Sequence, residues 1–393
     1  MTQNTALSSA PLQNFEALGL LPALCKAVQR LGFNKPTLIQ QKGLPALLKN
    51  KDVLLPSQTG SGKTATFLLA ALQKLAEKKQ KEGEFYQPYP QILILEPTRD
   101  LATQTAGVCR QLGRDIGVKT RLICGGTSRE QQLRSLEGGV EIIIATHGRL
   151  LDFVQNGQLD LSHIEYLVLD EADRLLDEEF SQSMTALIPY LADHPQTIFC
   201  SATLPDTVMA LAKKVTRNPV QIEIEEETKT PRRLQQRAIF LHDEEKESTV
   251  QNILTQFATE DRIIVFVNTK KNANELAKKV RSWGFKAESF HSERSQGERK
   301  KVLDHFQGKQ CAILVTTDIA ARGLDIDNVS IVINFDLPKS SEIYIHRIGR
   351  SARAGKKGKA LSLITFDQRH LLRDIEKNIQ HRIRIITPDD LTR

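Results

Sequence analysis

Long apolar runs are missing from this chain of 393 residues. No stretch approaches the roughly 18 apolar residues that a membrane-spanning helix needs, so we expect no membrane partner. The first ten residues are polar and lack the charged and apolar regions of a signal peptide. The chain also contains no Gly/Ser-rich tail and no RGG tract. These absences argue against a membrane protein, a secreted protein and a low-complexity binding tail.

Cysteines are few and dispersed. The chain has five, none of them in a CxxC pair. This pattern argues against a disulfide framework and against a zinc site, because both usually need closely spaced or evenly paired cysteines. We expect reduced thiols and a cytoplasmic location.

The composition, 40% hydrophobic and 26% charged, is sufficient for two domains with real cores. The net charge of +7 is unevenly distributed. From Pro231 onward the chain has 30 Lys and Arg against 21 Asp and Glu, whereas the preceding part has 24 against 26. A basic second half is compatible with a polyanionic partner and equally with a generally basic, solvated surface.

Short apolar runs alternate with stretches of helical periodicity in both halves, which predicts parallel α/β sheets. The expected strands are 52–55, 92–95, 142–145, 166–169, 197–200, 263–267, 312–315, 331–333 and 360–363. The pattern occurs twice and is interrupted by a polar stretch around Pro231. We expect one domain at 1–224, a linker at 225–234 and a second domain at 235–393, with a cleft between them that closes on ligands.

A carboxylate pair follows the apolar run 166–169. Asp170 and Glu171 begin the tetrapeptide Asp170-Glu171-Ala172-Asp173. Ligands of parallel sheets gather at the carboxyl ends of the strands, and Mg²⁺ is often held there by one or two carboxylates together with substrate phosphates. Alone, the tetrapeptide fits a solvated loop better than a metal site.

The segment Ser57 to Thr64 follows the first expected strand and precedes a helical run, as a phosphate-binding Walker A loop requires. Ser57 replaces the usual first glycine. Backbone N–H groups and the helix N-terminus favour phosphate, Lys63 can reach the β- and γ-phosphates, and Thr64 can bind Mg²⁺. With this loop present, Asp170 becomes the second Mg²⁺ contact and Glu171 the residue that polarises water. The expected loop contacts are Ser57, Gln58, Thr59, Gly60, Ser61, Gly62, Lys63 and Thr64.

With these motifs the chain resembles the DEAD-box ATP-dependent RNA helicases of superfamily 2, as a minimal core without long extensions. The resemblance implies two tandem RecA-like α/β domains. The segment 32–40, with Phe15 upstream, looks like the family's Q motif. The Gln40 amide suits the adenine edge and Phe33 could stack on the ring, which implies ATP.

Further segments resemble the RNA-contacting motifs of the family, with Asp100 in place of Glu and His147 in place of Pro. The resemblance implies RNA contacts by Pro97, Thr98, Arg99, Gly125, Gly126, Thr146, Gly148, Arg149, Thr316 and Arg322. Arginine guanidinium groups, hydroxyls and the backbone at glycine can hydrogen-bond phosphate oxygens. Such contacts carry little information about the base sequence.

The second half resembles motifs IV, V and VI, with Ser292 and Ala352 at glycine positions. The resemblance implies that Gly323 and Asp325 face ATP. Arg350 and Arg353 can lie on one face of a helix and could act as arginine fingers. Arg347 better fits a helix that faces RNA. The expected coupling residues between hydrolysis and RNA binding are Asp173, Ser201, Thr203 and His346.

These assignments predict an RNA-dependent ATPase that locally unwinds short RNA duplexes. ATP and Mg²⁺ are the expected cofactors, and RNA, held through its backbone, the expected partner. Two alternatives stay open: a slowly cycling RNA clamp without productive unwinding, and a DNA-directed ATPase of the same superfamily. We expect a monomer that meets protein partners within a ribonucleoprotein complex.

Overall fold

The computed structural model describes residues 14–56, 61–83, 89–172, 178–201, 206–223, 234–256, 262–308, 310–318, 329–351, 358–388 and 390. Backbone contacts divide the chain into two compact units, Met1–Glu225 (unit 1) and Glu226–Arg393 (unit 2). Within the described ranges, no helix combines the length and apolar character that crossing a bilayer requires.

Unit 1 contains a seven-stranded sheet in the order β3-β4-β2-β5-β6-β1-β7, and all its paired strands are parallel. The strands are β1 (Val53–Pro56), β2 (Ile92–Leu95), β3 (Thr120–Ile123), β4 (Ile142–Ala145), β5 (Tyr166–Leu169), β6 (Gln196–Ser201) and β7 (Val220–Gln221). The helices are α1 (Pro22–Arg30), α2 (Leu38–Leu48), α3 (Lys63–Glu82), α4 (Arg99–Leu112), α5 (Arg129–Leu136), α6 (His147–Gln155), α7 (Glu178–Leu187) and α8 (Asp206–Val215).

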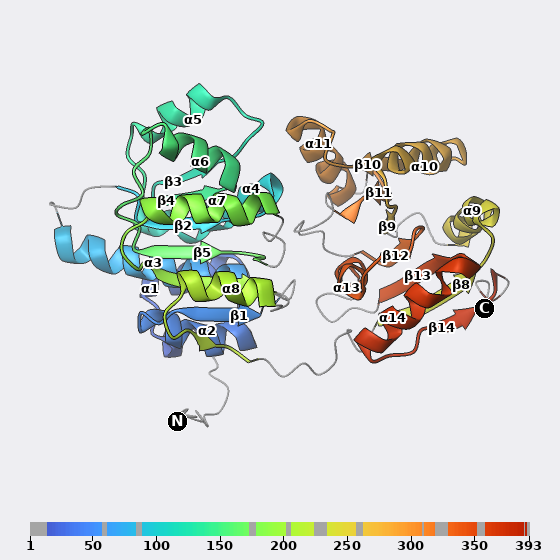
Figure 1. Ribbon diagram of the computed structural model, residues 1–393, viewed down its shortest axis with the longest axis horizontal. Helices are drawn as coiled ribbons and strands as arrows, with labels where there is room; N and C mark the ends of the chain where they lie inside the picture. The colour runs from blue at the N-terminus through green and yellow to red at the C-terminus, as the bar shows by residue number, and fades with distance from the viewer. Residues whose placement is uncertain are drawn as a thin grey trace. The chain divides into compact units, whose positions relative to one another are not determined.

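Both faces of this sheet are covered by helices, because successive side chains of a strand point to opposite faces. Ile94 and Val168 pack with α1 to α4, while Leu93 and Leu167 pack with α6 to α8. In Figure 1, α7 and α8 lie in front of the sheet. The continuous apolar runs of the central strands are therefore explained by burial on both sides.

Unit 2 has the same organisation, a parallel seven-stranded sheet in the order β10-β11-β9-β12-β13-β8-β14. Its strands are β8 (Leu234–Phe240), β9 (Ile263–Phe266), β10 (Ala287–Phe290), β11 (Ile313–Thr316), β12 (Ile331–Asn334), β13 (Gly358–Ile364) and β14 (Arg384–Ile386). Its helices are α9 (Lys246–Gln256), α10 (Lys270–Ser282), α11 (Gln296–Gln307), α13 (Ser341–Ile348) and α14 (Arg369–Ile379). Helices α9 and α10 pack on one face of the sheet, and α11, α13 and α14 pack on the other. The predicted parallel α/β architecture is confirmed in both units.

Candidate nucleotide and RNA site

The predicted carboxylates and the phosphate-loop lysine meet at the carboxyl edge of the sheet in unit 1. Lys63 begins α3, and Asp170 and Glu171 follow β5 directly. The Lys63 ammonium lies 2.8 Å from Asp170 Oδ1 and 3.6 Å from Glu171 Oε1. All three side chains are buried, with at most 9% of any of them exposed. Residues 107 positions apart thus form one buried charged cluster.

This environment perturbs the ionisation of the cluster. Burial alone would lower the pKa of Lys63, but the charges of Asp170 and Glu171 and the hydrogen bond to Asp170 raise it above its ordinary value. Burial raises the pKa of Asp170, and the adjacent Lys63 opposes that rise. The lysine is therefore the firmly protonated member of the cluster, and it neutralises part of the buried negative charge.

Backbone geometry at Glu171 is unusual. Its φ is +49°, in the left-handed region that non-glycine residues seldom occupy. Two hydrogen bonds maintain this turn: Glu171 N–H donates to Asp170 Oδ1 at 2.7 Å, and Ala172 N–H donates to the carbonyl of Cys200 on β6 at 2.8 Å. Strained residues of this kind are concentrated at functional sites and persist because the surrounding structure holds them.

Gln40 contacts the phosphate loop. Its Oε1 accepts from the N–H of Thr37 at 2.8 Å, which completes a capping box at the start of α2, and its Nε2 donates to the Gly62 carbonyl at 3.3 Å. Gly62 has φ +91°, and a Cβ there would lie 2.7 Å from Gln40 Nε2. Gln40 is 3% exposed, so its amide is buried beside the phosphate loop rather than on the helix surface.

The other predicted nucleotide contacts differ in exposure. Phe15 is buried in the core that covers one face of the sheet, whereas Phe33 is 37% exposed and has surface free for a ligand. Ser61 and Thr64 are half-buried at the start of α3. The predictions for Ser57, Gln58, Thr59, Gly60, Asp173, Thr203, Arg322, Gly323, Asp325 and Arg353 lie outside the described residues.

The predicted RNA-binding residues of unit 1 follow β2, β3 and β4 at the same edge of the sheet. Arg99 is exposed, and its guanidinium lies over Gly125 and Gly126. A Cβ at Gly126 would be 1.8 Å from Arg99 Nη1. These glycines therefore make room for an arginine, a constraint that the sequence did not reveal.

The N-terminal ends of two helices place the remaining predicted RNA-binding residues of unit 1 at this edge of the sheet. Thr98, which follows Pro97, caps α4 by accepting from Leu101 N–H at 3.3 Å. Thr146 occupies the N-cap position of α6, and the exposed Gly148 lies in its first turn. Arg149 Nη1 donates to the Thr127 carbonyl at 3.3 Å. The N-termini of two helices, beside two arginines, form an anion-attracting edge.

His147 stands where the family pattern has proline, and its ring contacts a neighbouring helix. Its Nδ1 is 3.1 Å from Ser183 Oγ on α7. The first turn of α6 is therefore tied to α7 by a side-chain hydrogen bond, where proline would supply only a fixed backbone angle.

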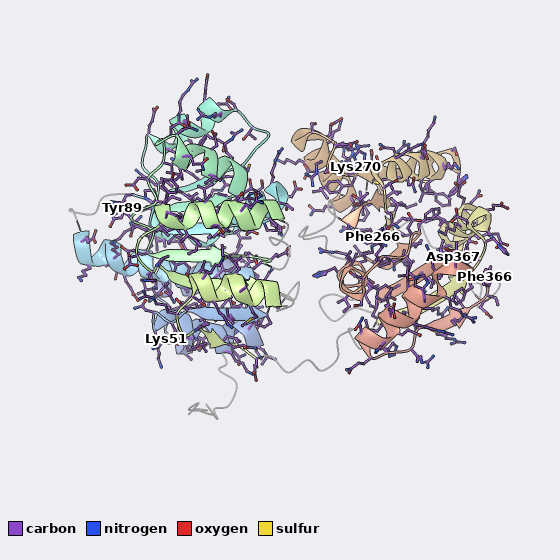
Figure 2. The ribbon with its side chains drawn as sticks, viewed as in Figure 1. Lys51, Tyr89, Phe266, Lys270, Phe366 and Asp367 are labelled. Carbon is purple, nitrogen blue, oxygen red and sulfur yellow. The ribbon has the colours of Figure 1, made fainter. Side chains whose placement is uncertain are left out.

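In unit 2, Arg347 is 1% exposed. This burial contradicts the interpretation that Arg347 faces RNA. Its guanidinium donates to both carboxylate oxygens of Asp318, at 2.6 and 2.8 Å, and to Asn268 Oδ1 at 3.2 Å. It also lies 5.1 Å from the ring centroid of Phe266, which is labelled in Figure 2. Arg347 thus holds the ends of several strands together.

The other predicted residues of unit 2 have different exposures. Arg350 is 2% exposed, and His346 is half-buried on α13. Thr316 is fully buried, and its hydroxyl donates to the Phe290 carbonyl at 2.9 Å. Ser201, the predicted coupling residue of unit 1, is buried at the end of β6.

Glu96 is a buried acid that the sequence interpretation missed. It follows β2 at the level where Asp170 follows the paired strand β5, since Leu95 lies opposite Leu169. Its Oε1 accepts from Thr105 Oγ1 at 2.6 Å, while its Oε2 has no hydrogen-bond partner among the described residues. Burial, and then the charge of Asp170, raise the pKa of Glu96 well above its usual range. The sequence signal that could have identified Glu96 is its position directly after an apolar strand.

We expect Glu96→Gln to raise the free energy of unfolding by about 1–3 kcal/mol at pH 8 and to change it little at pH 5. An acid whose pKa is raised by folding contributes stability at low pH, and that stability is lost as the pH rises through the folded-state pKa. The amide keeps an acceptor for Thr105 and cannot ionise. Urea unfolding at both pH values measures this, with the exposed Glu137→Gln as the unaffected control. A larger gain at pH 5 than at pH 8 would contradict the interpretation.

Comparisons with known proteins agree with the geometry. Residues 37–211 match the family model described as DEAD/DEAH box helicase, and residues 245–355 match the helicase conserved C-terminal domain. DEAD-box ATP-dependent RNA helicase 20 of Arabidopsis thaliana is 36% identical over 381 residues, which are 96% of this chain and 75% of that protein. ATP-dependent RNA helicase DbpA of Bacillus subtilis is 36% identical over 375 residues, which are 95% of this chain and 76% of that protein.

Two solved structures are similar over most of the chain. S. cerevisiae Dbp5 bound to RNA and ADP BeF3 has a TM-score of 0.85 and 30% identity, with 96% of this chain and 97% of that chain covered. Mss116p bound to ssRNA and AMP-PNP has a TM-score of 0.85 and 26% identity, with 96% and 80% covered. The predicted RecA-like fold of both units is thereby confirmed, and the chain belongs to the family of DEAD-box ATP-dependent RNA helicases.

Proposed function

We propose that this protein is an RNA-stimulated ATPase that separates or remodels short RNA duplexes. The observation that carries the proposal is the buried cluster of Lys63, Asp170 and Glu171 at the carboxyl edge of the sheet in unit 1. Phosphoryl transfer to water requires a cation that binds phosphate, a carboxylate that binds a metal ion and a carboxylate that orients water. Relatives named ATP-dependent RNA helicases support the choice of ATP and RNA.

ATP would bind unit 1 through its phosphates and its base. Lys63 and the N-terminus of α3 would hold the phosphates, with Gly62 permitting close approach of the backbone. Gln40 would recognise the adenine edge and Phe33 would stack on the ring. Gln40 also donates to the Gly62 carbonyl, so adenine bound at Gln40 would affect the phosphate loop.

The donor set fits Mg²⁺. The Thr64 hydroxyl and the Asp170 carboxylate are hard oxygen donors. The described residues contain no group of three or more His, Cys, Asp and Glu that could hold a metal ion. Mg²⁺ commonly accepts such a sparse protein set and completes its shell with water and substrate phosphates. Bound there, it would neutralise charge on the β- and γ-phosphates.

Hydrolysis would depend on charge placement. Glu171 would orient the attacking water from the turn in which its backbone has a φ of +49°. Arg350 and Arg353 would stabilise the negative charge of the transition state. Such arginines contribute about 10³–10⁵ in rate in related phosphoryl-transfer enzymes.

RNA would be held by its sugar-phosphate backbone. Arg99 and Arg149, the helix starts at Thr98 and Thr146, and the glycine backbone of unit 1 supply donors without base specificity. Thr316 would contribute backbone groups, since its hydroxyl is used within unit 2.

Ser201, Asp173, Thr203 and His346 would couple RNA binding to hydrolysis. The segment 225–234 would act as the linker between domains 1–224 and 235–393.

We also propose that the protein acts as a cytoplasmic monomer that meets other proteins within a ribonucleoprotein complex. All five cysteines are buried and unpaired, which suits a reducing compartment.

We expect single-stranded RNA to stimulate ATP turnover and DNA of the same sequence to stimulate it far less, because 2′-hydroxyl contacts distinguish the two. RNA affinity should fall linearly on a logarithmic salt scale and should vary little among unrelated sequences. A phosphate-release assay with matched RNA and DNA oligonucleotides, together with displacement of a short labelled RNA duplex, tests the proposal. Equal stimulation by DNA would favour the DNA-directed alternative, and turnover without displacement would favour the clamp.

A further inference from the structure

A basic stripe runs along the exposed face of α14 in unit 2. Arg369, Arg373 and Lys377 are all exposed and are spaced by four residues, so they lie on one side of the helix. The opposite side buries Leu372 and Ile375 against the sheet and α13. None of the three cations belongs to the nucleotide or RNA motifs described above.

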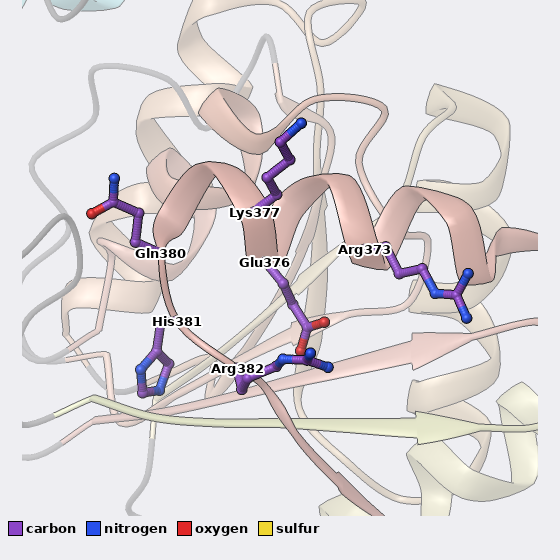
Figure 3. A pocket seen from close by; sticks show the side chains of 6 residues that line it. All are labelled: Arg373, Glu376, Lys377, Gln380, His381 and Arg382. Atoms are coloured by element: carbon purple, nitrogen blue, oxygen red, sulfur yellow. The ribbon is translucent and has the colours of Figure 1, made fainter.

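A hollow of about 580 Å³ lies beside the C-terminal half of α14. Its lining includes Arg373, Lys377, His381 and Arg382 (Figure 3). The helix ends at Ile379, and the φ of +53° at its C-cap residue Gln380 turns the chain so that Arg382 returns beside the helix. The hollow therefore has cations contributed from both the helix and the following segment.

One acid, Glu376, lines this hollow, and it is engaged by the backbone. Its Oε1 accepts from Ile383 N–H at 2.7 Å. From residue 369 to residue 386 the chain has five Lys and Arg against two Asp and Glu, which leaves a net charge of +3. The charge of the surface therefore complements a polyanion.

An exposed aromatic ring lies at the other end of the stripe. Phe366 is 57% exposed and is stacked on Phe240, with ring centroids 5.8 Å apart and 24° between the planes. His242 is 5.3 Å from Phe366, and the Arg369 guanidinium lies 5.6 Å from the Phe240 ring. Figure 2 labels Phe366 beside Asp367 at the surface of unit 2. Phe366 is thus held by packing on one side while much of its surface remains accessible.

We propose that this α14 surface, defined by Phe366, Arg369, Arg373, Lys377 and Arg382, binds single-stranded RNA outside the family motifs. A base would stack on Phe366, and successive phosphates would follow the cations of α14. Proteins that bind single strands without sequence preference combine these two elements, aromatic platforms and a positively charged track. The inference rests on the proposed RNA binding and adds a second contact on unit 2.

Charge reversal tests the cationic track. With a fluorescent 20-nucleotide single-stranded RNA followed by anisotropy, Arg373→Glu/Lys377→Glu should lower affinity about tenfold at 0.1 M salt. The slope of log affinity against log salt should fall in magnitude by about 1.4, since each phosphate contact on a single strand contributes about 0.7. The control Lys278→Glu/Lys286→Glu makes the same charge change at exposed sites on α10 and just before β10. It should leave affinity within about twofold and the slope unchanged.

Substitution of the aromatic ring tests the stacking platform independently of charge. Phe366→Ala should weaken RNA binding at least about fivefold, and Phe366→Tyr should retain it, because stacking on an aromatic side chain tolerates a hydroxyl. Circular dichroism melting verifies that each variant is folded. Equal losses in both charge-reversed proteins would reduce the effect to net charge and overturn the proposal. Unchanged affinity in Arg373→Glu/Lys377→Glu would also overturn it.

The two proposals fail in different ways. If RNA does not stimulate turnover of the wild-type protein, the proposed function is wrong. If RNA stimulates the wild type while the α14 variants bind RNA as tightly as it does, only the second RNA contact is wrong.

Discussion

Glu171→Gln should retain ATP binding and lower ATP turnover by about 10²–10⁴-fold, the usual contribution of a positioned general base. The amide has nearly the same shape as the carboxylate, so the buried turn with φ +49° should persist. It lacks the negative charge that would attract a proton from the attacking water. Binding of a fluorescent ATP analogue and single-turnover phosphate release separate the two effects.

The matched control is Glu165→Gln, located just before β5. Its carboxylate is 60% exposed and pairs with Lys78 rather than with the nucleotide cluster. We expect turnover and ATP affinity near those of the wild type, because exposed ion pairs contribute little. Turnover of Glu171→Gln equal to that of this control would remove Glu171 from the proposed role.

Arg347→Leu should lower the free energy of unfolding by about 3–5 kcal/mol, the cost of removing one partner from a buried ion pair. The substitution leaves Asp318 without its bidentate donor and removes donors to Asn268 and to the Asp336 carbonyl. Arg347→Lys should cost less, because the charge is kept although the planar fork is lost. Urea unfolding, followed by a probe in unit 2, measures both.

Arg384→Leu provides the comparison for Arg347. Arg384 is exposed on the edge strand β14, so its loss should change stability by less than about 0.5 kcal/mol. If Arg347→Leu were as stable as this control and defective only in RNA affinity, the sequence-based interpretation of an RNA-facing arginine would be restored.

The central strands could be predicted because they are buried on both faces, which makes them continuous apolar runs. The edge strands could not, since their burial is incomplete: β7 is exposed at both Val220 and Gln221, and β3 includes the half-buried Arg121. Edge strands carry mixed side chains because one of their sides has no neighbouring strand. Sequence periodicity therefore predicted the middle of each sheet better than its margins.

Site residues could be predicted from the sequence where their position depends on the spacing of neighbouring residues in the chain. Lys63 and Thr64 follow a glycine-containing loop, and Asp170 follows a strand, so their positions at the sheet edge could be inferred from the sequence. Contacts between distant segments could not be inferred in this way. The burial of Arg347 depends on Asp318, 29 residues away, and the Gln40 contact depends on Gly62, 22 residues away.

The placement of Arg99 over Gly126 has an evolutionary consequence. Any side chain at position 126 would meet the guanidinium, whose Nη1 would lie 1.8 Å from the new Cβ, and would also have to adopt a φ of +76°. The arginine is long and flexible, so it can swing aside while the core stays intact. Given the RNA contact proposed for Arg99, a mutation at Gly126 should appear in a genetic screen as weaker RNA binding rather than as a folding defect. Tolerated changes at positions 99 and 126 should then arise together.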